Sequence, residues 1–175
     1  MSLTPPVGPG DHVAGGPNAK VTLVEYGDYE CPYCGEAYRV IEIVRSVMGD
    51  ALRFVFRNFP IAEAHPHAVH AAEFAEAAAG IGNFWAAHDM LYENQAALAD
   101  ADLLFYAERL GLDQRAVLAA FAGRHSEKIR ADFTSGVRSG VNGTPTLFID
   151  GVRYDGPRDV ESLVAALRAA AHLPA

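Results

Sequence analysis

The spacing of hydrophobic residues changes twice along the chain and divides the sequence into three parts. In the first part, two short apolar runs with the composition of strands flank a segment whose apolar residues recur every three or four positions, as in a helix. The middle part, from about residue 66 to residue 140, has helical spacing only. The last part returns to two strand-like runs and one amphipathic helix. The predicted strands are 20–26, 52–59, 146–150 and 152–155, and the predicted helices are 32–48, 67–79, 84–94, 102–110, 113–122, 126–139 and 158–171.

The order of these elements predicts an α/β fold with a mixed sheet. A helix that crosses over between the first two strands brings them into parallel pairing. The last two strands meet at Asp150-Gly151, a dipeptide typical of tight hairpins, and are therefore antiparallel. We expect a sheet-and-helix domain formed by residues 18–62 and 141–175, an all-helical insertion at 63–140 and an irregular N-terminal arm at 1–17.

Two helices have faces that can be assigned from the spacing alone. In the first helix one apolar face is formed by Ala37, Ile41, Val44 and Met48. In the helix at 84–94, a second group has helical spacing, and we interpret it as packing between the two subdomains. That group consists of Phe84, Trp85, Leu91 and Tyr92.

Composition and charge narrow the class of protein. Half of the 175 residues are hydrophobic, which excludes a disordered chain, and 14 Lys and Arg against 22 Asp and Glu residues give a net charge of −8. No basic stripe suggests a nucleic-acid partner, and no run of about 18 apolar residues suggests contact with a membrane. The first basic residue is Lys20, so the start lacks the features of a secretory leader. We expect a cytoplasmic monomer, or a periplasmic one if Met1-Ser2-Leu3 replaces a removed leader.

The two cysteines, Cys31 and Cys34, lie where a predicted strand is followed by a predicted helix. Cys31 falls at the N-cap and Pro32 at the first helical position, where a backbone N–H would have no intrahelical partner. The N–H groups of the first turn and the helix dipole favour a thiolate on Cys31, the reactive form in disulfide exchange. Cys34, one turn further in, can attack a mixed disulfide on Cys31 and release the partner. The pair predicts redox chemistry with no cofactor other than its own disulfide.

A metal site is the alternative interpretation of the two cysteines. Zinc would need two further ligands, and the available cluster is His65, His67 and His70. The separations of these histidines do not match those of a zinc finger. We therefore expect no metal, and we interpret the histidines as part of a helix start or of a groove lining.

The motif Cys31-Pro32-Tyr33-Cys34 after a strand, together with Gly143-Thr144-Pro145-Thr146 before the last hairpin, resembles the thioredoxin superfamily. The long helical block between the motifs resembles the DsbA branch, which inserts a helical domain into a thioredoxin-like mixed sheet. The resemblance covers about residues 18–172. It implies a bacterial thiol–disulfide oxidoreductase that acts on protein or glutathione-type thiols and disulfides and has a redox partner still to be identified.

The resemblance assigns a substrate-binding role to two positions beside the redox pair. Pro145 corresponds to the family's cis-proline beside the redox pair. Thr144, just before it, would offer its backbone N–H and C=O to an extended substrate peptide. Pro32 and Tyr33, between the cysteines, would contact the same substrate, and Tyr29 is a further candidate for such a contact.

Glu25 corresponds to a buried acid that the family carries under its active site. The residue shares a strand face with Val21 and Leu23, which agrees with burial. Burial without a partner raises the pKa of a carboxyl group. Glu25 is therefore expected to take or give the proton of Cys34, whereas the alternative is a strand glutamate that faces solvent.

Tyr33 stands where the best-known oxidant of the branch has a histidine. Without an imidazolium beside the thiolate the disulfide should be less oxidising, so we expect a reduction potential between about −120 and about −270 mV. The direction of the reaction stays open among oxidation, isomerisation and reduction.

Two other functions also stay open at this stage. One is a glutathione-dependent isomerase or transferase on the same fold, in which a single Ser or Cys often positions the thiol. The presence of Cys34 argues against it. The other is a metal-binding or interaction module built on the two cysteines.

Overall fold

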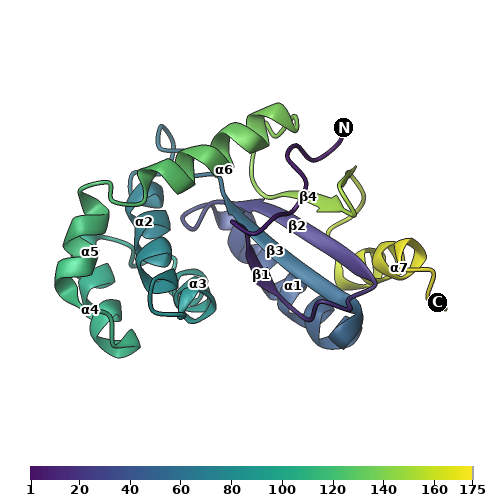
Figure 1. The fold of residues 1–175 in the computed structure, drawn as a ribbon, viewed down its shortest axis with the longest axis horizontal. Coiled ribbons are helices and arrows are strands. Elements are labelled where there is room, and N and C mark those ends of the chain that lie inside the picture. The colour runs from purple at the N-terminus through teal and green to yellow at the C-terminus, as the bar shows by residue number, and fades with distance from the viewer. Residues whose placement is uncertain (175) are drawn as a thin grey trace.

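The computed structural model describes residues 1–174, which form a five-stranded mixed sheet with helices on both faces and a group of helices beside it (Figure 1). The strands lie in the order β1-β3-β2-β4-β5. The α/β mixed-sheet prediction is confirmed. The strands are β1 (His12–Ala14), β2 (Val21–Gly27), β3 (Leu52–Asn58), β4 (Thr146–Ile149) and β5 (Val152–Tyr154).

Strand β2 is the centre of the sheet, and all seven of its residues are buried. It pairs in parallel with β3 on one side and antiparallel with β4 on the other. The parallel pairing and the β4–β5 hairpin were both predicted, and both are confirmed. At the hairpin, Asp150 and Gly151 have φ values of 46° and 79°, the left-handed backbone that a two-residue turn of this kind requires.

Two helices cover one face of the sheet. Helix α1 (Pro32–Met48) crosses over between β2 and β3, after which one turn of 3₁₀ helix (Gly49–Ala51) leads into β3, and α7 (Val160–Ala170) packs beside α1. The predicted apolar face of α1 is buried, so that prediction is confirmed. Helix α6 (Ser126–Arg138) packs on the opposite face, where its Gly136 lies against the rings of Tyr26 and Phe59.

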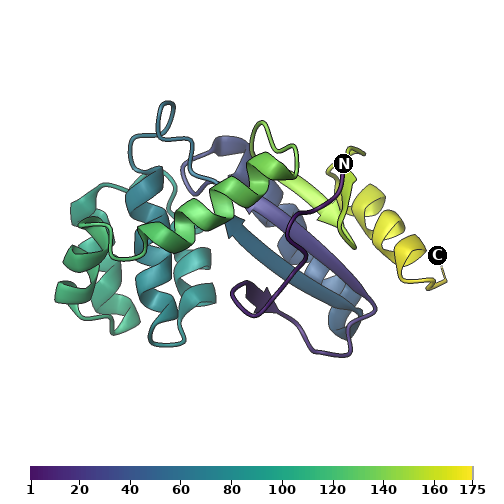
Figure 2. The same ribbon diagram turned by 45° about the horizontal axis from the view of Figure 1, so that its top comes forward.

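The remaining helices form the group at one end of the sheet, and α6 extends from this group across to the sheet (Figures 1 and 2). Helix α2 is rich in alanine, and its small buried side chains let α3, α4 and α5 pack closely around it. The bounds of these helices are α2 (Ala68–Ala79), α3 (Phe84–Glu93), α4 (Asp100–Leu110) and α5 (Gln114–Phe121).

Aromatic side chains of α3 join the helical group to the sheet. The ring of Trp85 lies 5.5 Å from that of Phe54, and the ring of Phe84 lies 6.3 Å from that of Phe56. The indole N–H of Trp85 donates to the carbonyl of Val13 in β1. The sequence-based interpretation of this group as packing between the subdomains is confirmed.

The N-terminal arm is not irregular throughout, and this part of the prediction is wrong. Residues His12–Ala14 form β1, which pairs antiparallel with the outer edge of β3. Leu3 is buried on the α6 side of the sheet, and Ser2 forms a bridge with Val152 of β5. The Pro- and Gly-rich composition hides this strand, because three residues are too short to show an alternating pattern.

A buried ion pair fixes the arm to the sheet. The Arg57 guanidinium donates to both Asp11 carboxylate oxygens, at 2.7 and 2.9 Å, and also to the carbonyls of Pro5 and Pro6. The two charged side chains are only 3% and 7% exposed. Burial is the largest single influence on the pKa of Asp11 and would raise it. The hydrogen bonds from Arg57, the hydrogen bond from the Gly8 N–H and the positive charges of Arg57 and Lys128 together lower the pKa below its usual value.

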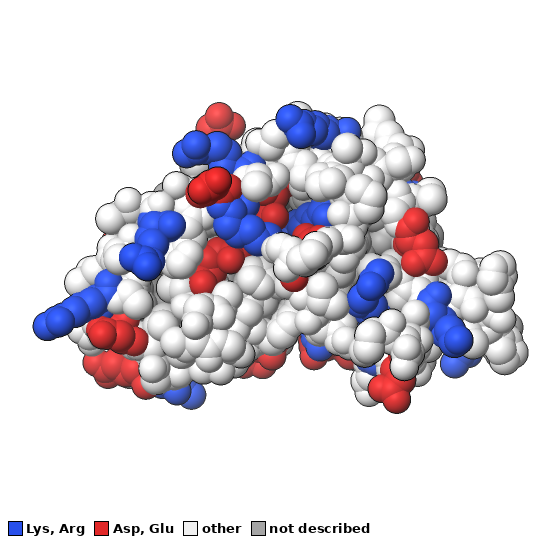
Figure 3. Space-filling model, viewed as in Figure 1, with Lys and Arg blue, Asp and Glu red and all other residues white. Residues whose placement is uncertain are grey.

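Acidic and basic side chains are intermixed over the face shown in Figure 3, where no continuous basic region appears. Of the helices within residues 1–174, none combines the length and the apolar character needed to cross a membrane.

Replacing Asp11 with alanine tests how strongly the arm contributes to stability. The substitution leaves the Arg57 charge buried without its anion, and removal of one partner from a buried pair costs about 3 kcal/mol or more. We expect urea unfolding at pH 7 to show a loss of that size. Glu63→Ala, an exposed carboxylate removed from a loop, should change the unfolding free energy by less than about 0.5 kcal/mol. Equal effects of the two substitutions would contradict the assigned role of the ion pair.

Candidate active site

Cys31 lies at the point where the buried central strand is followed by a helix. Strand β2 ends at Gly27, a three-residue loop follows, and Cys31 is the N-cap of α1 with an extended backbone (φ −70°, ψ 120°). Pro32 occupies the first helical position, as predicted. The side chains of Cys31 and Cys34 are 4% and 0% exposed, and both residues are free thiols in this structure.

The two thiols have opposite electrostatic environments. A hydrogen bond from the Cys34 thiol is the largest influence on the pKa of Cys31. Together with the backbone N–H groups of Cys34 and Tyr33, it lowers the Cys31 pKa to about 5 against the effect of burial. Burial, followed by the hydrogen bond to Cys31 and the charge of Glu25, raises the pKa of Cys34 well above its usual value. At neutral pH the first sulfur is therefore a thiolate and the second a thiol.

The segment before β4 closes over Cys31 from the other side. In its protonated form Cys31 donates to the carbonyl oxygen of Thr144 at 3.5 Å, and the Thr144–Pro145 peptide bond is cis. The turn is held by a 2.7 Å hydrogen bond from the Thr146 hydroxyl to the Gly143 carbonyl. Arg158 donates to the carbonyl of Pro145 at 3.1 Å.

Glu25 is buried on β2, so its predicted burial is confirmed and the solvent-facing alternative is wrong. Burial, with a smaller contribution from the negative charge of Cys31, raises its pKa to about 8, while the charge of Arg158 acts in the opposite direction. Its Oε1 atom has no hydrogen-bond partner among the described residues, and the same is true of the hydroxyl of Tyr92. A buried carboxyl without a strong partner can change its protonation near neutral pH, which suits proton transfer.

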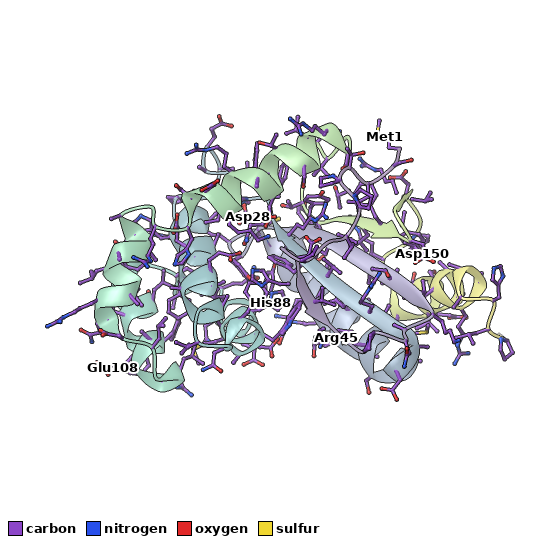
Figure 4. All side chains as sticks on the ribbon, in the orientation of Figure 1. Met1, Asp28, Arg45, His88, Glu108 and Asp150 are labelled. Carbon is purple, nitrogen blue, oxygen red and sulfur yellow. The ribbon has the colours of Figure 1, made fainter. Side chains whose placement is uncertain are left out.

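Asp28 organises the loop that precedes Cys31, and sequence reasoning gave it no such role. Its carboxylate accepts hydrogen bonds from the backbone N–H groups of Glu30 and Ile61, at 2.9 and 2.8 Å, and lies 2.8 Å from Nδ1 of His65. Its own backbone carbonyl accepts from the N–H of Cys31. In Figure 4 Asp28 lies at the end of β2 that meets the helical group.

The three histidines singled out in the sequence do not converge. His65 pairs with Asp28. Burial acts to lower the pKa of His65, but the hydrogen bond to Asp28 and the negative charges of Asp28, Cys31 and Glu30 together raise it. His70 pairs with Asp100 instead, and the backbone N–H of His67 donates to Glu30. Within residues 1–174, no group of three or more His, Cys, Asp or Glu side chains is arranged to hold a metal ion.

The tyrosines near the cysteines differ in position. Tyr33 is 65% exposed beside Cys31, where a substrate would reach it. Tyr29 is only 1% exposed, so the expectation that it contacts substrate is wrong. It packs on Phe56, and its hydroxyl lies 3.2 Å from Nδ1 of His88, a histidine whose pKa burial lowers to about 3. His88 is therefore neutral, and Figure 4 places it between the helical group and the sheet.

Two more residues contact the site and were missed from the sequence. Gln95, in the turn after α3, donates to the backbone carbonyls of Tyr29 and Cys31. Arg158, just before α7, contacts Pro145. Both are single polar residues outside any motif and far from the cysteines in sequence, so no local pattern marks them.

Comparison with solved structures places this site in a known fold. The structure matches oxidised BdbD from Bacillus subtilis with a TM-score of 0.85 and 19% identity, over 95% of this chain and 96% of that chain. It matches a thioredoxin-like oxidoreductase from Silicibacter pomeroyi DSS-3 with a TM-score of 0.81 and 26% identity, over 95% of each chain. The match to α-DsbA1 of Wolbachia pipientis has a TM-score of 0.82 and 18% identity, over 95% and 94%.

Curated relatives with higher identity are much longer proteins. Over 174 residues the chain is 45% identical to the Na⁺/H⁺ antiporter NhaA 3 of Salinispora tropica. This match covers 97% of the chain and 26% of the antiporter. It is 40% identical over 173 residues to NhaA 1 of Mycobacterium sp. (strain KMS), with coverage of 97% and 28%. The chain thus spans about a quarter of the length of these relatives.

A comparison with family models covers nearly the whole chain. The model described as Thioredoxin matches residues 8–169, which include the cysteine pair, the helical insertion and the segment around Pro145. The chain therefore belongs to the thioredoxin family, and its mixed sheet with an inserted helical subdomain is the fold of the DsbA-like branch.

Proposed function

We propose that the protein is a thiol–disulfide oxidoreductase that exchanges the Cys31–Cys34 dithiol or disulfide with protein or low-molecular-weight thiol partners. The observation that carries the proposal is the contrast between the two sulfurs, since Cys31 has a pKa of about 5 and the pKa of Cys34 is raised well above its usual value. A low-pKa first thiol reacts with partners, and a protonated second thiol waits until a mixed disulfide forms.

In the oxidising direction a substrate thiolate attacks the Cys31 sulfur of the disulfide. The Cys31–Cys34 bond breaks, a mixed disulfide forms on Cys31, and Cys34 leaves as a thiolate that takes up a proton. A second substrate thiolate then attacks the substrate sulfur of the mixed disulfide, and Cys31 leaves as a stable thiolate. The substrate loses two electrons and the cysteine pair gains them. The reducing direction is the reverse of these steps.

Glu25 handles the proton of Cys34 in this proposal. Its pKa of about 8 leaves it mainly protonated at neutral pH, so it can give a proton to the departing Cys34 thiolate. In the reducing direction the ionised carboxylate accepts the proton when Cys34 attacks. The charge of Glu25 contributes to the raised pKa of Cys34, so the two groups are electrostatically coupled.

The substrate would lie across the segment at Thr144 and Pro145. Thr144 lies two residues before the start of β4, and its carbonyl faces the Cys31 sulfur. A peptide bound there in extended form would place its cysteine next to Cys31. Pro32 and Tyr33 are exposed on the other side of the sulfur and would complete the contact surface.

The environment of Cys31 also bears on the direction of electron flow. A stabilised thiolate stabilises the reduced form and makes the disulfide a stronger oxidant. With a Cys31 pKa of about 5, we propose a disulfide more oxidising than that of thioredoxin, so that oxidation of partner thiols is the favoured direction.

The antiporter relatives favour a second candidate, which concerns the partner. Transport across a membrane needs spanning helices, and the helices within residues 1–174 do not meet that requirement, so the match concerns a segment with another role. We propose that this role is redox control of a cation-transport protein. A Cys34→Ser variant that carries glutathione on Cys31 as a mixed disulfide should be incubated with vesicles containing the Salinispora tropica antiporter. A cysteine thiolate of the antiporter should displace glutathione from Cys31 and form a mixed disulfide that dithiothreitol releases. Its absence, with Cys31→Ser/Cys34→Ser as the blank, would reject this partner.

Replacing Cys31 with serine tests the proposed function directly. The variant loses the attacking sulfur, so we expect turnover of insulin disulfides and of oxidised glutathione to fall at least 100-fold at pH 7. Cys34→Ser should instead accumulate mixed disulfides on Cys31. Rates for Cys31→Ser equal to those of the wild type would reject the function.

Glu25→Gln tests the proton transfer and has a defined pH signature. A carboxyl whose folded pKa is raised from 4.5 to about 8 contributes fully to stability below pH 4.5, and this contribution is lost as the pH rises through 8. With both proteins reduced, the free energy of unfolding measured in urea should be the same for Glu25→Gln and the wild type near pH 4. Near pH 9 the variant should be more stable by a few kcal/mol.

The same variant should slow the attack of Cys34 on the mixed disulfide about tenfold or more at pH 7, because the proton acceptor is gone. Glu127→Gln, an exposed carboxyl on α6, is the matched control and should change neither quantity. A resolution rate in Glu25→Gln equal to that of the wild type would remove Glu25 from the mechanism.

A further inference from the structure

Gln95 connects the inserted helical subdomain with the start of the redox helix. It lies in the turn between α3 and α4, and its side chain is half-buried. Its amide nitrogen donates to the carbonyl of Tyr29 at 2.8 Å and to the carbonyl of Cys31 at 3.0 Å. One side-chain amide thus uses both of its N–H groups on the short segment that leads from β2 into α1.

The carbonyl of Cys31 is the first acceptor of the helix. It also accepts from the backbone N–H groups of Cys34 and Gly35, at 3.0 and 3.2 Å. The orientation of this carbonyl therefore determines how the first turn is wound. That turn carries the Tyr33 and Cys34 N–H groups that bond to the Cys31 sulfur.

Gly35 provides the space that Gln95 occupies. A Cβ atom built on Gly35 would lie 1.9 Å from Oε1 of Gln95 and 2.7 Å from its Cδ. Glycine inside a helix is destabilising relative to alanine. Gly35, directly after Cys34, thus has no side chain at the place where the Gln95 amide lies against the helix.

We propose that Gln95 is a positioning residue for the Cys31–Cys34 pair, through which the helical subdomain holds the first turn of α1 in the geometry needed for thiol–disulfide exchange. The inference rests on the proposed function and adds a route by which the insertion controls it. Movement of the helical subdomain relative to the sheet would act on the Cys31 carbonyl, and through it on the donors that face the sulfur.

The first test compares Gln95→Met, which keeps the volume and loses both donors, with Gln114→Met, which removes an exposed amide of α5 bonded only to Glu108. The readouts are the pH profile of Cys31 alkylation by iodoacetamide and the equilibrium of the Cys31–Cys34 pair with glutathione.

Loss of a hydrogen bond to the first turn should raise the apparent pKa of Cys31 by about half a unit to one unit. Alkylation at pH 4 would then be about three- to tenfold slower, and the glutathione equilibrium would shift toward the disulfide by a similar factor. Gln114→Met should leave both unchanged.

The second test displaces the amide without removing it. Gly35→Ala should shift the alkylation profile in the same direction as Gln95→Met. In Gly35→Ala/Gln95→Ala the collision is absent, so the double variant should behave like Gln95→Ala alone and the effects should be non-additive. This pair decides the question even if Gln95→Met does not fold.

A loss of thermal stability in Gln95→Met with an unchanged pH profile and glutathione equilibrium would show a purely structural role and overturn the proposal. Additive effects of Gly35→Ala and Gln95→Ala would do the same. Alkylation reports on the Cys31 sulfur itself, so these results hold even if the protein turned over no disulfide. In that case the proposed function would fail and the positioning role would stand.

Discussion

The structure depends on holding one ionised sulfur at the end of a fully buried strand. A charge in that position needs donors, and water cannot supply enough of them beside a sulfur that is 4% exposed. The start of α1 supplies backbone N–H groups, and Cys34 supplies a thiol. The sheet places Thr144 against the same atom, because β4 is the direct neighbour of β2. The order of the strands, the start of α1 and the spacing of the two cysteines therefore all serve to stabilise the Cys31 thiolate.

This arrangement produces two different thiols from identical side chains three positions apart. Cys31 caps the helix and faces its free N–H groups, whereas Cys34 lies one turn inside and is shielded from solvent by the core. Glu25 adds a buried acid with one unpartnered oxygen on the same side of the sheet. An uncompensated carboxyl lowers the stability of a fold, so its presence at this place is understandable only in terms of chemistry.

The limits of sequence reasoning follow from where each signal resides. The helix α1, the β4–β5 hairpin and the cysteine motif are encoded in contiguous residues, so periodicity and spacing identify them. Burial of Glu25 was expected mainly from the family resemblance, and strand alternation agreed with it. Arg57, by contrast, alternates like a solvent-facing residue but is buried, because Asp11 and the arm cover it from 46 positions away. Asp28 and Gln95 also bond to backbone groups that are far away in the sequence. The pattern of neighbouring residues does not reveal such partners.

The absence of a histidine between the cysteines changes how the thiolate is stabilised rather than whether it is stabilised. An imidazolium supports a thiolate only below its own pKa, so its contribution fades as the pH rises. The thiolate of Cys31 is stabilised by the Cys34 thiol and by two backbone N–H groups, which are uncharged donors. Backbone donors do not titrate, and the Cys34 thiol has a raised pKa, so the support they give persists through the neutral range. His65 bonds to Asp28 on the adjoining loop, and the negative charge of Cys31 is one of the causes that raise the pKa of this histidine. The thiolate in this chain is therefore a property of the fold at the β2–α1 junction, and Tyr33, between the cysteines, is left exposed.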